Sequence, residues 1–204
     1  MKIGFIQASS QIEKNTILYE CTKDYGEVIN FGCFEDEENY SYVEIALEIC
    51  LLISSQAVDF IVTGCSSGQG MMIACNSLPN LICGYLPTPQ DAYLFGRIND
   101  GNVASLPLGL NYGWAGEINL KTTLQQLFEE PFGIGYPLKD AKRKIEDTKK
   151  IKVLNQLCKK DIIEFLDEID DQLIIKVLSK KNVIDYILEQ GKEQRIKQWI
   201  LNRR

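Results

Sequence analysis

Histidine is absent from this sequence of 204 residues. Because histidine is the usual proton carrier near neutral pH, its absence excludes Ser-His-Asp and Cys-His hydrolases together with histidine-ligated metal sites. The seven cysteines are odd in number, scattered, and never spaced as CxxC. Neither a disulfide framework nor a zinc site is predicted, and most of the cysteines are expected to be small buried side chains. We expect no metal and no organic cofactor.

Long apolar runs and an excess of basic residues are also missing. No run approaches the ~20 residues that cross a bilayer, and the N-terminal MKIGFIQ lacks the order of a secretory signal, so we expect a cytoplasmic protein. The net charge is -6, from 22 basic and 28 acidic residues. We therefore expect no nucleic-acid partner and no membrane partner, and any anionic ligand has to be held by a local site.

What the sequence does contain is a regular alternation over roughly its first 130 residues, with short β-favouring runs between longer helical patterns. This alternation is typical of βαβ units around a parallel sheet. Strands are predicted at residues 2–7, 27–31, 59–63, 81–86 and 102–106, and helices at about 11–23, 40–54, 69–77, 89–98 and 114–128. The predicted fold is a three-layer α/β/α, Rossmann-like domain with a five-stranded parallel sheet.

The pattern changes at FGIGYP, residues 132–137, where glycines and prolines interrupt it. From Lys139 onward the chain is dense in Lys, Glu, Asp, Leu and Ile, which predicts three or four amphipathic helices. We therefore divide the chain into an α/β domain, residues 1–135, and a C-terminal helical extension, residues 136–204. The extension is expected to pack on the sheet domain or on a second subunit.

The segment VDFIVTGCSSGQGMMIACNS, residues 58–77, runs an apolar strand through small residues into a helix. Its GCSSGQG portion should form a turn at the carboxyl end of a parallel sheet, where open α/β folds bind ligands. Gly68 and Gly70 permit close approach of a ligand, and the free amides at the helix start stabilise negative charge. Facing these amides, Cys65 is expected to ionise readily and to act as a nucleophile or base. The alternative is that Cys65 is merely small and buried, with glycines that serve only the turn.

Two separated motifs resemble one family. CSSGQGMMIACN follows the pattern CGTGxGxxxAxN of ribose-5-phosphate isomerase B and galactose-6-phosphate isomerase, and INDGNVASL resembles the HNDxNVLxL segment of that family at the expected distance. The resemblance covers about residues 1–135 and says little about the extension. It implies an aldose–ketose isomerase for sugar phosphates that works through an enediolate, as a homodimer or homotetramer with sites built across the subunit interface.

The resemblance also implies roles for individual residues. Cys65 matches the base that moves a proton between C1 and C2. The amides that stabilise the enediolate in the family correspond to the remaining residues of the turn: Ser66, Ser67, Gly68, Gln69 and Gly70. Ser67 is also assigned to catalysis. Asn99 and Asp100 match an Asn-Asp pair whose asparagine contacts the substrate.

The sequence departs from the family at several positions. Ile98 stands where the family has the histidine credited with opening the sugar ring. An Asp-His pair of the first loop is replaced by Ala8 and Ser9. The two arginines that bind phosphate have no clean counterpart, and the candidates for this role, which a solvated helix face explains as well, are Lys139, Lys142 and Arg143.

Three further residues are candidates for substrate contact. Ser9 ends the first strand at the same edge as Cys65, where its hydroxyl could bond a sugar. Tyr40 and Tyr42 lie near the position of a substrate-contacting tyrosine in the family, although tyrosines there also cap a core. We favour an isomerase whose substrate needs no ring opening, and the alternative is a catalytically inactive sugar-phosphate-binding or assembly subunit. Nucleotide binding ranks last because GxGxxG and GKS/T are both absent.

Overall fold

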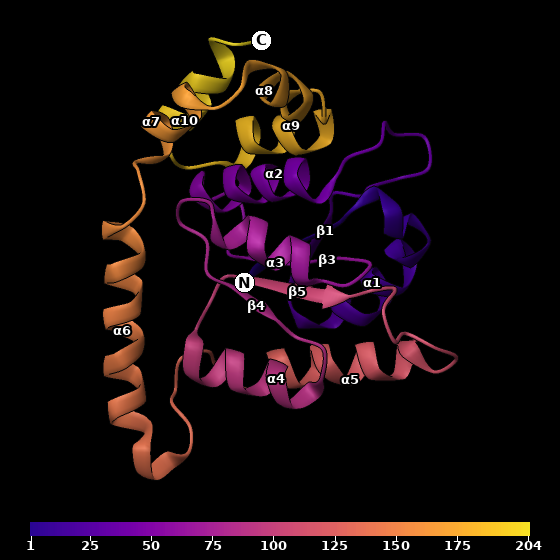
Figure 1. Cartoon of the computed structure of the whole chain (residues 1–204), viewed down its shortest axis with the longest axis vertical. Coiled ribbons are helices and arrows are strands. Elements are labelled where there is room, and N and C mark those ends of the chain that lie inside the picture. Colours follow the sequence, from indigo (N-terminus) through magenta and orange to yellow (C-terminus); the bar gives the residue numbers. More distant parts are fainter.

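Residues 1–204 of the computed structural model are arranged around a five-stranded parallel sheet (Figure 1). The strands are β1 (Lys2–Gln7), β2 (Glu27–Asn30), β3 (Phe60–Cys65), β4 (Cys83–Tyr85) and β5 (Val103–Pro107), in the spatial order β2-β1-β3-β5-β4. All five predicted strands are confirmed. β4 is shorter than predicted because the amide of Ile82 bonds the side chain of Asn102 at 2.9 Å instead of a neighbouring strand.

Helices cover both faces of the sheet, which confirms the three-layer prediction. α1 (Asn15–Thr22), α4 (Pro89–Leu94) and α5 (Gly116–Phe128) share an apolar cluster with Phe60 and Val62 on one face. α2 (Tyr42–Ser54) and α3 (Gln69–Asn76) share a second cluster with Ile61 on the other face. Successive residues of β3 thus point to opposite faces, and the strand is buried throughout because both faces are covered.

Three helices differ from the predicted ranges for local reasons. The helix predicted at 40–54 begins at Tyr42, because Ser41 caps it by accepting a hydrogen bond from the amide of Val43. The helix predicted at 11–23 is divided into a 3₁₀ turn η1 (Ser9–Lys14), α1 and a short η2 (Lys23–Tyr25). The helix predicted at 89–98 is α4 followed by a π-turn, η3 (Phe95–Asn99).

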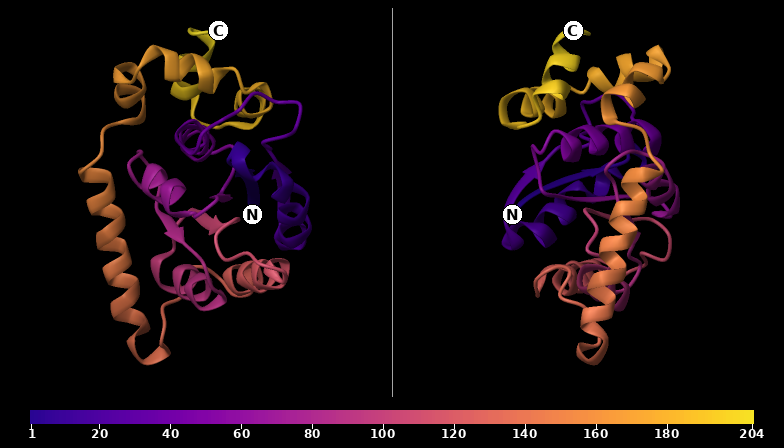
Figure 2. Two further views of the ribbon diagram at one scale, coloured as in Figure 1. Left: turned by 45° about the vertical axis from the view of Figure 1, so that its right-hand side comes forward. Right: turned by 90° about the vertical axis from the view of Figure 1, so that its left-hand side faces the viewer.

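The C-terminal extension contains more helices than the three or four that were predicted. After η4 (Leu138–Asp140) come five helices: α6 (Ala141–Leu157), α7 (Ile162–Glu168), α8 (Asp171–Leu178), α9 (Lys181–Gln190) and α10 (Gln194–Leu201). The side chains of Asp161 and Asp170 begin new helices, and Gly191 ends α9, so the apolar pattern is cut into shorter pieces. α6 stands beside the sheet domain, whereas α7–α10 lie over α2 (Figures 1 and 2).

α2 lies between the sheet and the four last helices. Residues 45–52 of α2 are all buried, and all of them except Glu48 are apolar, as expected for a helix that is covered on every side. One apolar cluster joins Ile61 of the sheet, Ile49 of α2, Ile184 of α9 and Trp199 of α10. The extension and the sheet therefore share a core, and the boundary after residue 135 stays a prediction. None of the helices is both long and apolar enough to span a membrane.

Arg97 connects the turn before β5 to the end of α5. Its side chain is fully buried, and its guanidinium donates to the carbonyl of Leu127 at 2.8 Å. The same group lies over the ring of Phe132, 5.4 Å from the ring centre. Burial lowers the pKa of Arg97. By binding a free carbonyl at a helix end, Arg97 fixes η3, and with it the Asn99–Asp100 segment, against α5.

Candidate active site

The Cys65 turn, residues 65–70, joins β3 to α3 at the carboxyl edge of the sheet. Gly68 has φ of +75°, and a Cβ at this position would lie 2.8 Å from the carbonyl carbon of Leu106 and from the ring of Tyr85. Any other residue would be strained and crowded here. The tight strand-to-helix turn that the glycines predicted is therefore present.

The Cys65 thiol faces the amides of this turn. Its Sγ accepts a hydrogen bond from the amide of Gly68 at 3.2 Å. No side chain caps α3 at Gly68, and although the amide of Gln69 bonds Ser67, the amides of Gly70 and Met71 stay available to a ligand. Backbone donors that converge on one place stabilise an anion, on sulfur or on a substrate oxygen.

Other thiols of the chain are less suited to act as bases. Burial raises the pKa of Cys33 to about 11, partly opposed by a hydrogen bond from Ser9, and raises that of Cys50 to about 12. Both groups therefore stay protonated at neutral pH. Cys158 is exposed, but it lies at the end of α6, away from the Cys65 turn.

Ser66 is held by two neighbouring loops. Its carbonyl accepts hydrogen bonds from the amides of Gly109 at 3.0 Å and Leu110 at 2.7 Å. Its hydroxyl accepts from the side-chain amide of Gln11 at 2.9 Å. Gln11 was not among the predicted site residues; it is 7% exposed, and its amide oxygen has no partner. Only its place two residues after Ser9, at the same edge of the sheet, could have indicated it.

The remaining residues of the turn are more open. The amide of Gln69 donates to the hydroxyl of Ser67 at 3.3 Å, so the hydroxyl hydrogen of Ser67 is left to donate elsewhere. The ring of Tyr42 lies beside Gly70, 3.6 Å from the place of a Cβ. Tyr42 is 44% exposed and forms one side of the turn.

Ser9 and Tyr40 are paired with each other beside the Cys65 turn. The Ser9 hydroxyl accepts a hydrogen bond from the amide of Tyr40 at 2.7 Å, and the Ser9 amide donates to the Tyr40 carbonyl at 3.2 Å. The amide of the preceding residue, Ala8, donates to the carbonyl of Gly64 at 3.0 Å. The Tyr40 hydroxyl instead bonds Ser179 of the extension at 3.1 Å, so this group points away from the turn.

Asn99 and Asp100 lie at the opposite edge of the sheet. They precede Val103, which pairs with Ile61 at the start of β3, whereas Cys65 pairs with Pro107 at its end. One strand length, about 17 Å for six residues, separates the two edges. The carboxylate of Asp100 forms an ion pair with Lys152 of α6. Within one chain the structure does not bring this pair to Cys65.

Lys139 and Arg143 are also distant from Cys65 in the same chain. They lie where α6 begins, and α6 stands at the amino edge of the sheet (Figure 1). Arg143 forms an ion pair with Asp147 one helical turn later, at 3.1 Å. Both side chains are therefore on the same side of the sheet as Asn99.

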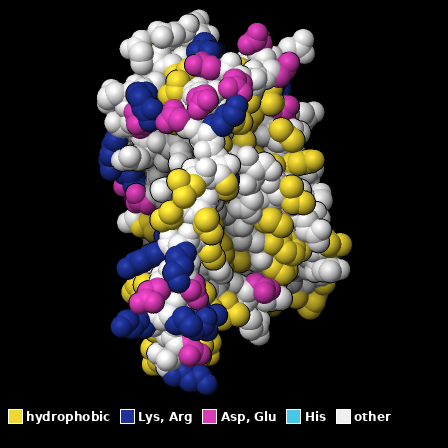
Figure 3. All heavy atoms as spheres, turned by 60° about the vertical axis from the view of Figure 1, so that its left-hand side comes forward, with side chains coloured by type: hydrophobic (Ala, Val, Ile, Leu, Met, Phe, Trp, Pro, Cys, Tyr) yellow, Lys and Arg dark blue, Asp and Glu magenta, His cyan; other side chains and the backbone are white.

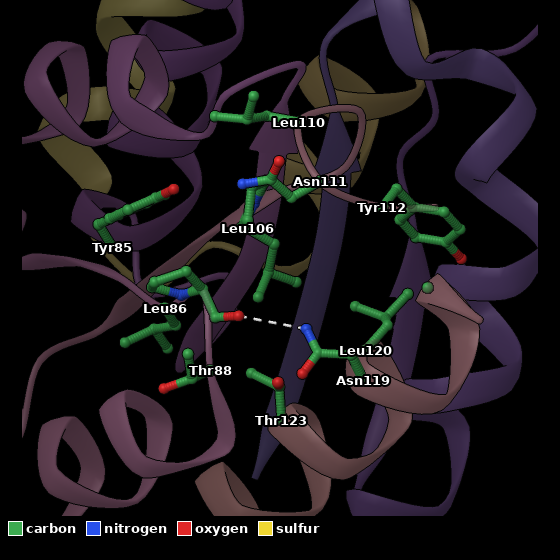
Figure 4. A pocket seen from close by; sticks show the side chains of 13 residues that line it. Tyr85, Leu86, Thr88, Leu106, Leu110, Asn111, Tyr112, Asn119, Leu120 and Thr123 are labelled. Carbon is green, nitrogen blue, oxygen red and sulfur yellow. Dashed lines mark hydrogen bonds between the residues drawn. The ribbon is translucent and has the colours of Figure 1, made fainter. Parts of the chain in front are cut away.

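A cavity of about 260 Å³ adjoins the turn at the carboxyl ends of β4 and β5 (Figure 4). Tyr85 and Leu106, which contact the place of a Cβ on Gly68, form the wall between them. The polar residues that line the cavity are neutral, and Asn119 bonds the carbonyl of Pro87 at 3.2 Å across it. The cavity therefore offers hydroxyl and amide groups, but no cation for a phosphate.

Comparison with known proteins places the chain. The sequence model of the Ribose/Galactose Isomerase family matches residues 3–132. No curated protein matches the sequence significantly. One similar solved structure is that of 4-deoxy-L-threo-5-hexosulose-uronate ketol-isomerase complexed with a tartrate. Its sequence is 35% identical, and the alignment covers 100% of this chain and 99% of the ketol-isomerase chain, with a TM-score of 0.94.

Two further solved structures show how far the similarity extends. A ribose-5-phosphate isomerase from Vibrio parahaemolyticus is 30% identical and covers 100% of this chain and 99% of that chain, with a TM-score of 0.94. A type B ribose 5-phosphate isomerase from Trypanosoma cruzi is 19% identical, covers 76% of this chain and 98% of that chain, and shares the fold with a TM-score of 0.63. The extension is thus common to the first two structures. The chain belongs to the ribose/galactose isomerase family.

Proposed function

We propose that this chain is an aldose–ketose isomerase in which Cys65 is the base that moves a proton between C1 and C2. The observation that carries the proposal is the Cys65 sulfur at the carboxyl edge of the sheet, 3.2 Å from the amide of Gly68. A base and backbone donors for a developing oxyanion are the groups that an enediolate mechanism requires. Membership in an isomerase family supports the same chemistry.

Starting from the aldose, the Cys65 thiolate takes the proton from C2. The electrons of that bond form a C1–C2 double bond, and the negative charge moves to the carbonyl oxygen, where the amides of the Cys65 turn stabilise it. The proton then returns from sulfur to C1 while the proton on O2 moves to O1, which leaves a carbonyl at C2. Ser67 is suited to relay this second proton, since its hydroxyl accepts from Gln69 and retains its own hydrogen. No co-reactant is needed.

The proposed substrate is open-chain at the reacting carbons. Ile98 stands where the family has its ring-opening histidine, and the chain has no histidine anywhere else. A sugar phosphate that is not locked in a ring satisfies this condition and agrees with the family. Cys65 then needs no second acid for ring opening.

A keto-uronate is the second candidate substrate. The ketol-isomerase that is 35% identical bears a name that describes a 4-deoxy sugar acid with a second carbonyl at C5. Such a molecule lacks the 4- and 5-hydroxyls that close an aldose ring. It also carries a carboxylate in place of a phosphate, which is consistent with the loss of the two phosphate-binding arginines.

We further propose that two copies of the chain complete each site. Asn99 and Asp100 lie at the amino edge, so the amino edge of a second copy has to face Cys65 for these residues to reach a substrate. α6 exposes apolar side chains beside that edge, with Leu154 62% and Leu157 77% accessible. Figure 3 shows apolar side chains together with Lys and Arg on the face that carries α6. A homodimer that covers this face would bury them.

Deuterium exchange tests the proposed chemistry. The protein is incubated in deuterated water with open-chain ketose phosphates and with 4-deoxy-5-hexosulose-uronate, and deuterium at C1 or C2 is followed by NMR. We expect exchange with at least one compound, its loss in Cys65→Ser, and its retention in Cys158→Ser, which removes the exposed thiol. Absence of exchange with every compound would contradict the proposed activity and favour the alternative, a sugar-phosphate-binding subunit. The replacement of the Asp-His pair by Ala8 and Ser9 also favours that alternative. The cytoplasmic location stays a prediction.

A further inference from the structure

The C-terminal extension makes several polar contacts with the loop that leads from β2 into α2, residues 31–41. Lys180 donates to both carboxylate oxygens of Glu37, at 2.6 Å each. Asn182 donates to the carbonyl of Phe31 at 3.0 Å, and Lys176 forms an ion pair with Glu38. These contacts come from α8, α9 and the residues between them.

Lys180 is the central residue of this contact. It is 1% exposed, and its ammonium lies over the ring of Tyr40, 5.1 Å from the ring centre. The partner carboxylate of Glu37 also accepts the amide of Phe34 at 2.9 Å. Because a buried charge is costly without its partner, Lys180 and Glu37 hold the loop in one arrangement.

The loop continues directly into the proposed site. The amide of Tyr40 donates to the hydroxyl of Ser9, and the ring of Tyr42, two residues later, lies beside Gly70 of the Cys65 turn. The Tyr40 hydroxyl is bonded to Ser179, the residue before Lys180. The extension is thus linked to Ser9 and Tyr42 by one short segment of chain.

We propose that Lys180 is a positioning residue for substrate binding, which sets the places of Ser9 and Tyr42 through Glu37 and Tyr40. The helices α8 and α9 then form the outer support of one side of the site. This inference rests on the proposed isomerase function, and it assigns a role to the C-terminal extension.

The position of Lys180 predicts a specific kinetic effect. Ser9 and Tyr42 belong to the substrate-contacting side, whereas Cys65 is fixed independently by β3 and by the amide of Gly68. Loosening the loop should therefore weaken substrate binding more than proton transfer. We expect Lys180→Met to raise KM about tenfold or more while kcat changes less than about threefold, since misplaced binding groups act through geometry.

The test compares Lys180→Met with Lys180→Arg and with Arg195→Met. Arg195→Met is the matched control, because the ion pair of Arg195 with Asp161, at 3.1 Å, lies within the extension and does not touch the loop. Hydrogen exchange of the amides of residues 33–42 is measured without substrate, followed by KM and kcat. We expect faster loop exchange and a higher KM in Lys180→Met, partial rescue in Lys180→Arg, and wild-type values in Arg195→Met.

A second readout separates a local effect from a general loss of structure. In a Cys158→Ser background, the rate of Cys65 alkylation by iodoacetamide should be the same with and without the Lys180→Met substitution, because the Cys65 turn is held by other contacts. If Lys180→Met does not fold, Ser179→Ala and Glu37→Gln are measured in its place, because each removes one contact between the extension and the loop. Wild-type loop exchange and KM in a folded variant would overturn the inference. A wild-type protein without turnover would instead end the proposed function, while loop exchange would still decide the role of Lys180.

Discussion

The two edges of the sheet use polar groups in different ways. At the carboxyl edge the structure gathers backbone amides, one thiol and neutral hydroxyls in the Cys65 turn and the adjoining neutral cavity. At the amino edge the side chains are charged, with Asp100 paired to Lys152 and Arg143 paired to Asp147. The first edge suits proton transfer at carbon, and the second suits recognition of a polar or charged end of a substrate.

Under the proposal that Asn99 contacts the substrate, a single chain holds only part of each site. About 17 Å of strand separates Cys65 from the segment that carries Asn99, so no side chain bridges the gap. An arrangement in which each copy offers its carboxyl edge to the amino edge of another would give two equivalent sites, as the two-fold symmetry of most dimers provides.

The sharpest way to test this division is to inactivate each edge in a different chain. Cys65→Ser is expected to slow turnover by ~10²–10⁴-fold, the usual contribution of a general base, and Asn99→Ala disables the amino edge. After the two inactive variants are mixed and allowed to exchange subunits, a mixed dimer regains one intact site. We expect about a quarter of wild-type activity, as random pairing in a symmetric dimer implies. A mixture that stays as slow as its parents would show that each site is built from one chain.

The geometry of the carboxyl edge is tested by Gly68→Ala. Positive φ and contact with Leu106 at 2.8 Å should together cost ~2–4 kcal/mol of folding free energy. Gly113→Ala is the matched control, since Gly113 also has positive φ but no neighbour closer than 4.0 Å, and it should cost about 1 kcal/mol. Chemical denaturation measures both changes. Equal losses would mean that close packing around Gly68 contributes nothing.

The buried Glu48 of α2 is expected to make folding stability depend on pH. Its carboxylate oxygens are buried without partners, and burial raises the pKa of Glu48 well above its ordinary value of 4.5, although Lys180 opposes the shift. The folded state therefore holds the proton more tightly than the unfolded state. Folding stability should fall as pH rises through the interval between the two pKa values, by ~1.4 kcal/mol per pH unit.

Replacing this acid removes the titration. Glu48→Gln should be progressively more stable than wild type as pH rises above 4.5, and the advantage should level off once Glu48 ionises in the folded wild type. Thermal unfolding between pH 4 and 8 measures the difference. Parallel curves for the two proteins would contradict a buried, protonated Glu48.

The smallest effect is expected at the amino edge. The side chains of Lys152 and Asp100 are 40% and 33% exposed, so Lys152→Met should cost only ~0.2–1 kcal/mol of stability. Salt should reduce the difference further. A loss above about 2 kcal/mol would show that this pair is coupled to η3 more strongly than an exposed ion pair allows.

Much of the fold could be predicted because periodicity reflects burial. β3 is predicted from a short β-favouring run with apolar residues at 60–62, and the turn after it from two glycines and a cysteine at the strand end. The number of helices in the extension could not be read reliably, because Asp161 and Asp170 act as helix caps only in a context that the sequence pattern does not reveal.

The site was harder to predict than the fold. The structure places Ser9 and Tyr42 beside the Cys65 turn, but the sequence could not show that the Tyr40 hydroxyl turns toward Ser179. Gln11 donates to Ser66 from within η1, where its own backbone is non-helical. No periodic pattern in the sequence encodes such a conformation. The separation of Asn99 from Cys65 follows from the parallel direction of β3 and β5, because Asn99 precedes β5 whereas Cys65 ends β3.

The burial of α2 on every side limits how this protein can be shortened. Residues 45–52 rest on the sheet inward and on the last four helices outward. Cutting the chain after α6 would expose the apolar outer side of α2 to water. We therefore expect such a truncated protein to aggregate unless the outer side chains of α2 are redesigned as polar.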